Sequence, residues 1–494
     1  MTSHSPATHD PNGTTGRAGS LLRALVVLLL VIKLAQTVFA GVIVDEAYYW
    51  LWAQHPDWSY YDHPPMVGWT IMAFERLGLP AFWALRLPVV LTLLGDLWVI
   101  RAFARLPGVR QAQGFLPTAL LFLITPVFWI MTSVAFPDHL MVFFGLLALY
   151  GFTRFALDLP HARRWLYFGA VALGLATLSK FNAALIGLGF AAAILLTPAW
   201  WRHLRNPHLY IAALISMACL APVFWWNIAN GNAAFDFILY SRHHGVDGPP
   251  TIAGLSGFGF LTVVTTSPFF VIATLVWIVA VLRRPVHTEA GDNRLGFFVF
   301  IASTLAIGAL ALRSNVHFHW NLVAWLGFVP VLAVWLRHPI LRLGHILYGA
   351  VIALALAINF TLAPVTMLTG PVDRVTAWAY GWDDIAAAVE RLREDEGADF
   401  VAGSHYGTTA RLALALDDAD VRNLESRQSQ FDFWFDRSSA AGQSAIIRTD
   451  PFNPMTGHIR RQFETVSKLE EVEVRVAGRE ILTHTLWLGE GFRP

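Results

Sequence analysis

Long apolar segments alternate with short polar stretches over roughly the first three quarters of the chain. Eleven of these segments have a length that suits a membrane-spanning helix. They fall at 21–42, 82–100, 112–133, 138–153, 165–179, 182–200, 209–226, 257–282, 296–312, 319–336 and 343–364. The pattern predicts a mostly α, polytopic membrane protein with about eleven transmembrane helices at 21–364, after a disordered polar tail at 1–20.

The distribution of arginine predicts the direction of the spans. With the N-terminus in the cytoplasm, the inner loops carry most of the arginines, among them Arg101, Arg105 and Arg154. The alternate loops carry far fewer cations, which is the bias expected of loops on the outer side. This arrangement places the loop at 43–81 outside, and an odd number of spans places residues 365–494 outside too.

The C-terminal region has a different pattern from the membrane segments. Short β-like stretches alternate there with helical ones: the β-like stretches lie at 399–403, 445–448 and 472–476, and the helical ones at 382–393 and 408–416. Alternation of this kind is typical of an α/β domain. The sequence therefore predicts a C-terminal extracytoplasmic α/β domain at 365–494.

Composition agrees with a membrane protein and excludes one class of function. The chain has 55% hydrophobic and 14% charged residues, whereas a soluble protein carries about a quarter charged residues. The formal net charge is +1, which gives no basic patch for nucleic acid. With a single cysteine, the chain forms no intrachain disulfide.

The first outer loop carries the strongest candidate chemistry. Asp45 and Glu46 end the first apolar segment, and aromatic residues crowd after them. One interpretation is an aromatic belt at the lipid headgroups with two solvated carboxylates. The other is a sugar site, because rings stack on pyranose faces and carboxylates accept hydroxyl protons. The second is favoured by the position of Asp45 against the apolar segment, where an unpaired carboxylate is costly.

Two further outer turns carry candidate groups. Asp138 and His139 follow Pro137 at the start of an apolar segment, where Asp138 can cap a helix or take part in a reaction. Lys180 lies at the outer membrane edge. It can be a snorkelling lysine or a ligand for phosphate, to which an ammonium is a good point-charge partner.

The remaining outer segments have less specific patterns. Arg313, His317 and His319 form either a plain polar turn or a site for phosphate or metal. The loop at 225–248 mixes polar and aromatic residues, including Arg242, and is interpreted as a lid.

The candidate groups together point to an enzyme. Carboxylates, aromatic rings and cations all gather on one side of the membrane, while the span interiors are mostly apolar, with Lys33 and Asp96 as exceptions. A transporter or flippase of a lipid-linked sugar precursor, the alternative function, should place polar groups at mid-span. A scaffold would leave the clustered charges without a reason. A one-sided site next to lipid suits an enzyme with a lipid-linked substrate.

At these residues the chain resembles a known family. It is similar to the GT-C glycosyltransferases of the protein mannosyltransferase and aminoarabinose transferase superfamily, called glycosyltransferase family 39-like in bacteria. The matching segments are Asp45-Glu-Ala-Tyr-Tyr-Trp50, Tyr61-Asp-His-Pro-Pro65, Phe136-Pro-Asp138, Leu178-Ser-Lys-Phe181, His319-Trp320, Gly403-Ser-His-Tyr406 and Ser429-Gln-Phe-Asp-Phe-Trp434. They extend over nearly the whole chain, and the first two at their spacing are the most specific.

The resemblance implies a reaction and a set of roles. A polyprenyl-phosphate sugar is the donor, and an acceptor hydroxyl attacks its anomeric carbon with inversion. Asp45 matches the family's usual candidate base, and Asp138 matches the second-loop carboxylate, so the expected catalytic residues are Asp45, Glu46 and Asp138. The expected ligands of the donor phosphate are Lys180, His63, Arg86, Arg313, His317 and His319. Those expected around the sugar and acceptor are Tyr48, Tyr49, Trp50, Tyr61, Asp62 and His139.

The resemblance also indicates partners and location. The expected acceptor is lipid A or its core, another cell-envelope glycan or a protein, with lipid A favoured. His63 stands where the aminoarabinose transferases carry a lysine, which argues against transfer of aminoarabinose. No cofactor is expected, because the mannosyltransferase-like branch generally uses no divalent metal. The expected location is the bacterial inner membrane, with the site and the C-terminal domain facing the periplasm.

Overall fold

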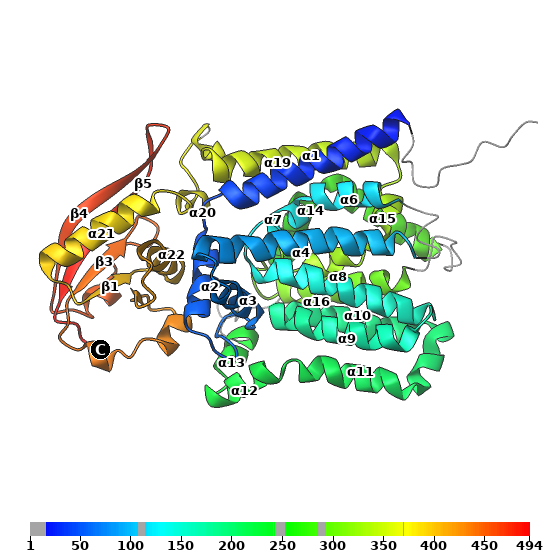
Figure 1. Cartoon of the computed structure of the whole chain (residues 1–494), viewed down its shortest axis with the longest axis horizontal. Coiled ribbons are helices and arrows are strands. Elements are labelled where there is room, and N and C mark those ends of the chain that lie inside the picture. Colours follow the sequence, from blue (N-terminus) through cyan, green and yellow to red (C-terminus); the bar gives the residue numbers. More distant parts are fainter. Residues whose placement is uncertain (1–15, 107–113, 241, 243–251, 284–292, 369) are drawn as a thin grey trace, which may run out of the picture.

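The structure is a computed structural model, and it describes residues 16–106, 114–240, 242, 252–283, 293–368 and 370–494. Helices make up the N-terminal three quarters, and a mixed sheet lies in the C-terminal quarter. Figure 1 shows long, roughly parallel helices on one side of the molecule and the sheet with its covering helices on the other. The short helices α2 (Val44–Gln54) and α3 (Met66–Arg76) lie where the two parts meet.

Five helices in the described residues are long and apolar enough to cross a membrane. They are α1 (Arg17–Phe39), α4 (Ala81–Phe103), α8 (Pro137–Ala156), α16 (Arg294–Ala311) and α19 (Pro339–Thr361). Bent helix pairs raise the number to as many as eight if each pair is one span. These pairs are η1 (Phe181–Ala183) and α10 (Ala184–Leu196) with η2 (Pro198–Arg205), α11 (Pro207–Ala218) with α12 (Ala221–Ala229), and α14 (Ile252–Thr266) with α15 (Pro268–Arg283). The chain is thus a multi-pass membrane protein, as predicted.

Several predicted spans are interrupted or displaced in the structure. The shorter helices of the membrane part are α6 (Phe115–Ile124), α7 (Pro126–Met131), α9 (Ala162–Ser179), α17 (Leu322–Leu326), η4 (Val329–Val331) and α18 (Leu332–Trp335). The segment 112–133 is divided at Pro126 and the segment 319–336 contains Pro330, because proline lacks the donor that would continue a helix. Helix α1 begins at Arg17, inside the segment expected to be a disordered tail.

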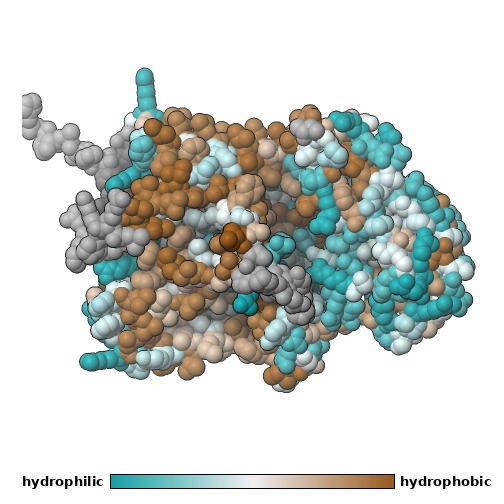
Figure 2. Space-filling model, turned by 180° about the vertical axis from the view of Figure 1, so that it is seen from behind, coloured by the Kyte–Doolittle hydropathy of each residue, from teal (hydrophilic) through white to brown (hydrophobic). Residues whose placement is uncertain are grey.

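The surface of the membrane part is apolar. Large hydrophobic side chains are exposed along its helices, for example Leu91, Leu94 and Trp98 on α4. Figure 2 shows hydrophobic residues over the membrane part and mostly hydrophilic ones over the C-terminal part. Apolar surface on this scale marks a contact with lipid or protein, and the long parallel helices make it a lipid-facing surface.

Lys33, a charged residue within the apolar helix α1, lies inside the helix bundle. The Lys33 ammonium is fully buried and donates to the backbone carbonyl of Trp129, at 2.5 Å, and to the hydroxyl of Ser133, at 2.6 Å. Asp96 on α4 is fully buried as well. Lys33 thereby joins α1 to α7, which is a packing role and does not require a transport path through the membrane.

The C-terminal part is built on a five-stranded sheet in the order β2-β1-β3-β5-β4. Its strands are β1 (Phe400–Gly403), β2 (Arg422–Asn423), β3 (Ala445–Thr449), β4 (Thr465–Val476) and β5 (Arg479–Glu490). Strand β1 runs parallel to β2 and β3, whereas β5 pairs antiparallel with β3 and β4. The longer helices are α21 (Trp382–Glu396) and α22 (Tyr406–Leu416). Shorter ones are η5 (Val365–Leu368), α20 (Arg374–Ala377), η6 (Gln430–Phe433), η7 (Ser438–Ala440) and α23 (Gly457–Arg460). The short helix α13 (Ala233–Leu239) belongs to the N-terminal helical part.

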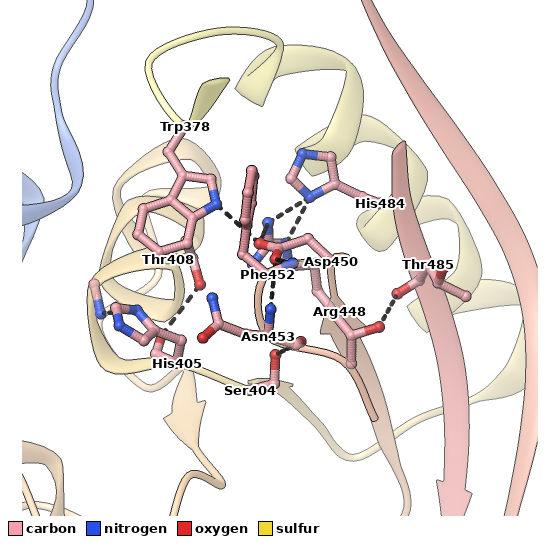
Figure 3. A network of polar contacts seen from close by, with 12 residues as sticks. Trp378, Ser404, His405, Thr408, Arg448, Asp450, Phe452, Asn453, His484 and Thr485 are labelled. Carbon is pink, nitrogen blue, oxygen red and sulfur yellow. Dashed lines mark hydrogen bonds and ion pairs between the residues drawn. The ribbon is translucent and has the colours of Figure 1, made fainter. Parts of the chain in front are cut away.

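A buried polar network fixes the start of α22 on this sheet (Figure 3). Arg448 of β3 donates to Asp450, at 2.6 Å, and to Nδ1 of His484 on β5, at 2.8 Å. The indole of Trp378 donates to the same carboxylate of Asp450, at 3.0 Å, and its ring lies 5.0 Å from that of His405. His405 caps α22, so the network determines where the first residue of that helix lies.

Candidate active site

Helix α2 positions the two adjacent carboxylates. Asp45 and Glu46 lie in its first turn, where the helix dipole favours negative charge. The helix packs against α3, α4 and, from the C-terminal part, α22. Helix α2 therefore lies between the long helices and the C-terminal sheet (Figure 1).

Glu46 is held by protein groups on both of its oxygens. One oxygen accepts from the guanidinium of Arg86 on α4 and from the backbone N–H of Ala135, at 2.7 Å. The other accepts from the backbone N–H of Ile43, at 3.1 Å. Both side chains of the Glu46–Arg86 pair are almost completely buried. The pair fixes α2 against α4 and the turn before α8, which favours a structural role over phosphate binding for Arg86.

Asp45 is partly buried and interacts with a different set of groups, among them Tyr406 and Arg427. Burial raises the pKa of its carboxyl to about 6, and the negative charges of Asp62 and Glu46 add to this effect. A hydrogen bond from Tyr406 and the charge of Arg427 partly oppose it. A carboxylate with a pKa near neutral pH is well placed to accept a proton.

Asp62 connects the loop after α2 to the C-terminal part. It accepts a hydrogen bond from the Tyr48 hydroxyl, at 2.5 Å, and its other oxygen lies 3.7 Å from the Arg427 guanidinium. The backbone N–H of Gln430 donates to the Tyr48 hydroxyl at 2.9 Å, and the Gln430 side chain accepts from the backbone of Tyr61 at 2.7 Å. The segment 427–430 thus completes the site from the C-terminal side.

Asp138 and Lys180 form a buried ion pair beside these groups. The Lys180 ammonium lies 2.7 Å from both oxygens of Asp138. The ring of Tyr49 lies 6.2 Å from that of His63. The pKa of Tyr49 is raised by burial and by the charges of Asp45 and Asp138, which places this tyrosine near both carboxylates. The turns that contain Asp138 and Lys180 therefore meet the loop that contains Tyr49 and His63.

A group of nitrogen side chains gathers around Lys180. Burial, together with the charges of Arg242, Lys180 and His317, lowers the pKa of His63 well below its usual value. His319 is affected in the same way, with Lys180 the foremost of its charged neighbours. At neutral pH these two imidazoles are uncharged hydrogen-bonding groups. Burial also lowers the pKa of Lys180, and the adjacent Asp138 carboxylate opposes this shift. Arg242 is the further cation of the set, and Asp62 opposes the lowering of its pKa by burial. A set of cations and neutral hydrogen-bond donors matches the charge and the acceptor oxygens of a phosphate group.

Other predicted residues lie apart from this group. His139 faces α4 and shares a 2.8 Å hydrogen bond with Thr92, and the indole of Trp50 donates to Glu75 of α3, also at 2.8 Å. Arg313 is exposed beyond the end of α16. These positions favour packing for His139 and Trp50, and a surface role for Arg313. The fourth aromatic candidate, Tyr61, packs on Phe237 with ring centres 4.6 Å apart.

The structure adds three groups to the predicted set. Arg427 and Tyr406 come from the C-terminal part, and Arg242 comes from the loop interpreted as a lid, of which residues 241 and 243–248 lie outside the described residues. The ring of Trp320 lies 4.7 Å from the Arg242 guanidinium. Tyr406 ends one segment of the family resemblance and Arg427 precedes another, so that resemblance was the available signal for the outer-domain pair.

The described residues contain no group of three or more His, Cys, Asp or Glu side chains that could hold a metal ion. The histidines near Lys180 are accompanied by cations, and the carboxylate of Asp138 is occupied by Lys180. The donor set of the site therefore suits an anion better than a metal.

Comparisons with known proteins indicate the class to which the chain is similar. A family model described as dolichyl-phosphate-mannose-protein mannosyltransferase matches residues 62–226. The lipid A galacturonosyltransferase RgtD of Rhizobium johnstonii is 27% identical over 394 residues, covering 77% of this chain and 78% of that protein. The crystal structure of ArnT from Cupriavidus metallidurans bound to undecaprenyl phosphate has a TM-score of 0.62 at 17% identity, covering 95% of this chain and 98% of that one. ArnT in the apo state gives a TM-score of 0.60 at 15% identity.

The fold and the site define a membrane glycosyltransferase of the GT-C type. The class predicted from the resemblance is thereby confirmed. The chain is similar in sequence to a lipid A glycosyltransferase, and in fold to ArnT over almost its full length.

Proposed function

We propose that this enzyme transfers a sugar from a polyprenyl-phosphate donor to an acceptor hydroxyl, with inversion at the anomeric carbon. The supporting observation is that Tyr49 lies near both Asp45, whose pKa is raised to about 6, and Asp138, which is paired with Lys180. Asp45 suits the role of a general base, and the cations around Lys180 suit a phosphate leaving group. The solved structure of ArnT, which shares this fold, binds undecaprenyl phosphate.

Each charged group has a proposed step. Asp45 accepts the proton of the acceptor hydroxyl as its oxygen attacks the anomeric carbon. The bond from that carbon to the phosphate oxygen breaks, and polyprenyl phosphate leaves with the electron pair. Lys180 and Arg242 stabilise the charge that develops on the phosphate, while His63 and His319 donate hydrogen bonds. Asp138 orients Lys180 through their ion pair.

The donor sugar in this proposal is a hexuronic acid. RgtD, the relative with 27% identity, is a galacturonosyltransferase. A uronic acid carries a carboxylate that needs a cationic partner, and Arg427 is available beside Asp45 and Asp62. Its side chain is 46% exposed, lies 4.9 Å from the Tyr406 ring and reaches Asp62 only at 3.7 Å. An arginine fork recognises a carboxylate with two parallel hydrogen bonds.

The proposed acceptor rests on the same relative, and the proposed topology rests on the sequence pattern of the membrane segments. Lipid A is the proposed acceptor, because the relative RgtD is a lipid A glycosyltransferase. The hydropathy pattern supports about eleven crossings of the bacterial inner membrane. The arginine bias supports a periplasmic position for the site and the C-terminal part. Five long helices, or up to eight spans with the bent pairs, account for part of these crossings in the described residues. No cofactor or metal is part of the proposed reaction.

Mass spectrometry of lipid A from a deletion strain tests the proposal. We expect lipid A to lose a hexuronic acid residue, and the residue to return with the wild-type gene but not with Asp45→Asn. Unchanged lipid A in the deletion strain, with another glycan altered instead, would overturn the proposed acceptor. Loss of a neutral sugar would overturn the proposed donor.

A purified-enzyme assay tests the role of Arg427 separately. The Arg427→Gln variant should discriminate less between a uronic acid donor and the corresponding neutral hexose donor, by about 10- to 100-fold, which is the usual value of a hydrogen bond to a charged group. Arg475→Gln is the matched control, because Arg475 is exposed on β4 and pairs with Glu473. Equal discrimination by wild type and Arg427→Gln would rule out this role.

A further inference from the structure

A second charged cavity lies at the other end of the membrane part. It has a volume of about 620 Å³ and lies between the ends of α4 and α8 and the start of α9. Figure 1 shows these helix ends on the side away from the outer sheet. Its polar lining is cationic: three arginines, Arg101, Arg105 and Arg154, line it together with aromatic rings.

The cations of this cavity have no acidic neighbour in its described lining. The Arg154 guanidinium lies 4.4 Å from the ring of Trp165 and donates to the Tyr150 hydroxyl at 3.1 Å, so two aromatic side chains hold it in place. Its Nε is buried without a partner among the described residues. The dipoles at the ends of α4 and α8 favour cations, but they do not account for three arginines turned to one cavity.

One face of α4 leads from the lipid surface into the cavity. Leu91, Leu94 and Trp98 are large exposed apolar residues on this helix, and Trp98 is 66% exposed. Arg101 follows them at the same alternation of three and four residues, which keeps these four side chains on one face of α4. Arg105 lies in the turn directly after the helix ends at Phe103 and lines the same cavity. The face is therefore apolar where acyl chains lie and cationic where the helix reaches the membrane surface.

We propose that this cavity binds the phosphate headgroup of an anionic glycerophospholipid, with the acyl chains along the apolar face of α4. Cationic pockets between membrane helices are suited to acidic lipid headgroups. Trp98 at the cavity rim also suits the headgroup level, where indole rings concentrate. A free phosphate would use the arginines alone and leave the aligned apolar face without a role, so the lipid fits more of the observations.

Native mass spectrometry of the full-length enzyme in detergent tests the proposal with phosphatidylglycerol and phosphatidylcholine as probes. The wild type should retain phosphatidylglycerol more strongly. The double variant R101Q/R105Q should bind phosphatidylglycerol about 30-fold less tightly and lose the preference. The two lost cations contribute about equally to the affinity for an anionic lipid, and their contributions multiply. The control R163Q/R164Q removes two exposed arginines from the first turn of α9, outside the cavity lining, and should keep the preference.

Each other outcome contradicts the proposal. Equal retention of the two lipids by the wild type would exclude a site for anionic headgroups. Equal loss in both double variants would assign the effect to general surface charge. Displacement of the lipid by inorganic phosphate at millimolar concentration would assign the cavity to a free anion. Thermal unfolding of each variant establishes that it is folded, and the lipid preference of the wild type tests the proposal without any substitution.

Discussion

Asp45 and Glu46 are neighbours in the sequence but belong to different environments. Glu46 points into the protein, where Arg86 and two backbone N–H groups satisfy both of its oxygens. Asp45 points towards Tyr406 and Arg427, and burial raises its pKa to about 6. One carboxylate fixes α2 in place, and the other remains able to exchange a proton.

The difference explains why a pair of adjacent carboxylates suits this site. Successive residues of a helix point in different directions, so one can be anchored in the protein while the next faces the substrate. Glu46 is anchored beside Asp45 by Arg86, and the negative charge of Glu46 contributes to the raised pKa of Asp45.

Removing the charge of Glu46 should have the largest effect on the fold. In Glu46→Gln the Arg86 guanidinium stays buried without its partner, which typically costs about 3–5 kcal/mol of unfolding free energy. Thermal and denaturant unfolding in detergent measure the change, with Asp45→Asn as the matched control on the same helix turn. Equal stability of the two variants would contradict the structural role of Glu46.

The Asp138–Lys180 pair should affect donor binding more than the chemical step. Lys180→Gln is expected to raise the KM for the donor about 10- to 100-fold, since a hydrogen bond to a charged group contributes about 1.5–3 kcal/mol. Asp138→Asn should have a smaller effect on KM, because it leaves the ammonium in place. If Asp138→Asn instead abolished turnover while KM stayed constant, Asp138 would replace Asp45 as the base.

The pH dependence of the rate tests whether Asp45 is the group that must be ionised. Asp45 accepts a proton only when ionised, so kcat/KM should fall about tenfold per pH unit below its pKa of about 6. Asp62→Asn removes a like charge that helps to raise this pKa, and should move the acid limb to lower pH. A limb that stayed in place in Asp62→Asn would assign it to another group.

Much of the fold could be predicted from hydropathy and periodicity. The apolar pattern predicts a multi-pass membrane protein, and the β-like stretches at 399–403 and 445–448 coincide with β1 and β3. The interruptions near Pro126 and Pro330 could not be predicted from hydropathy, because a broken segment is as apolar as a continuous one. The beginning of α1 at Arg17 was missed for the opposite reason, since its first turn is polar.

The site could be predicted only where the groups lie next to the membrane segments. The pattern and the resemblance indicated Asp45, Asp138 and Lys180, which the structure brings near one another. The partners of Glu46 and the approach of Arg427 depend on contacts between residues far apart in the chain. Such contacts leave no local trace in one sequence, so Arg86 was expected to bind phosphate and Arg427 was not expected at all.

Turnover of the purified Asp45→Asn variant with a polyprenyl-phosphate sugar donor tests the central claim most directly. The substitution keeps the shape of the side chain and removes the proton acceptor. We expect kcat to fall about 10²- to 10⁴-fold, the usual contribution of a general base, with an unfolding temperature close to that of the wild type. Wild-type turnover by the folded variant would show that Asp45 is not the base.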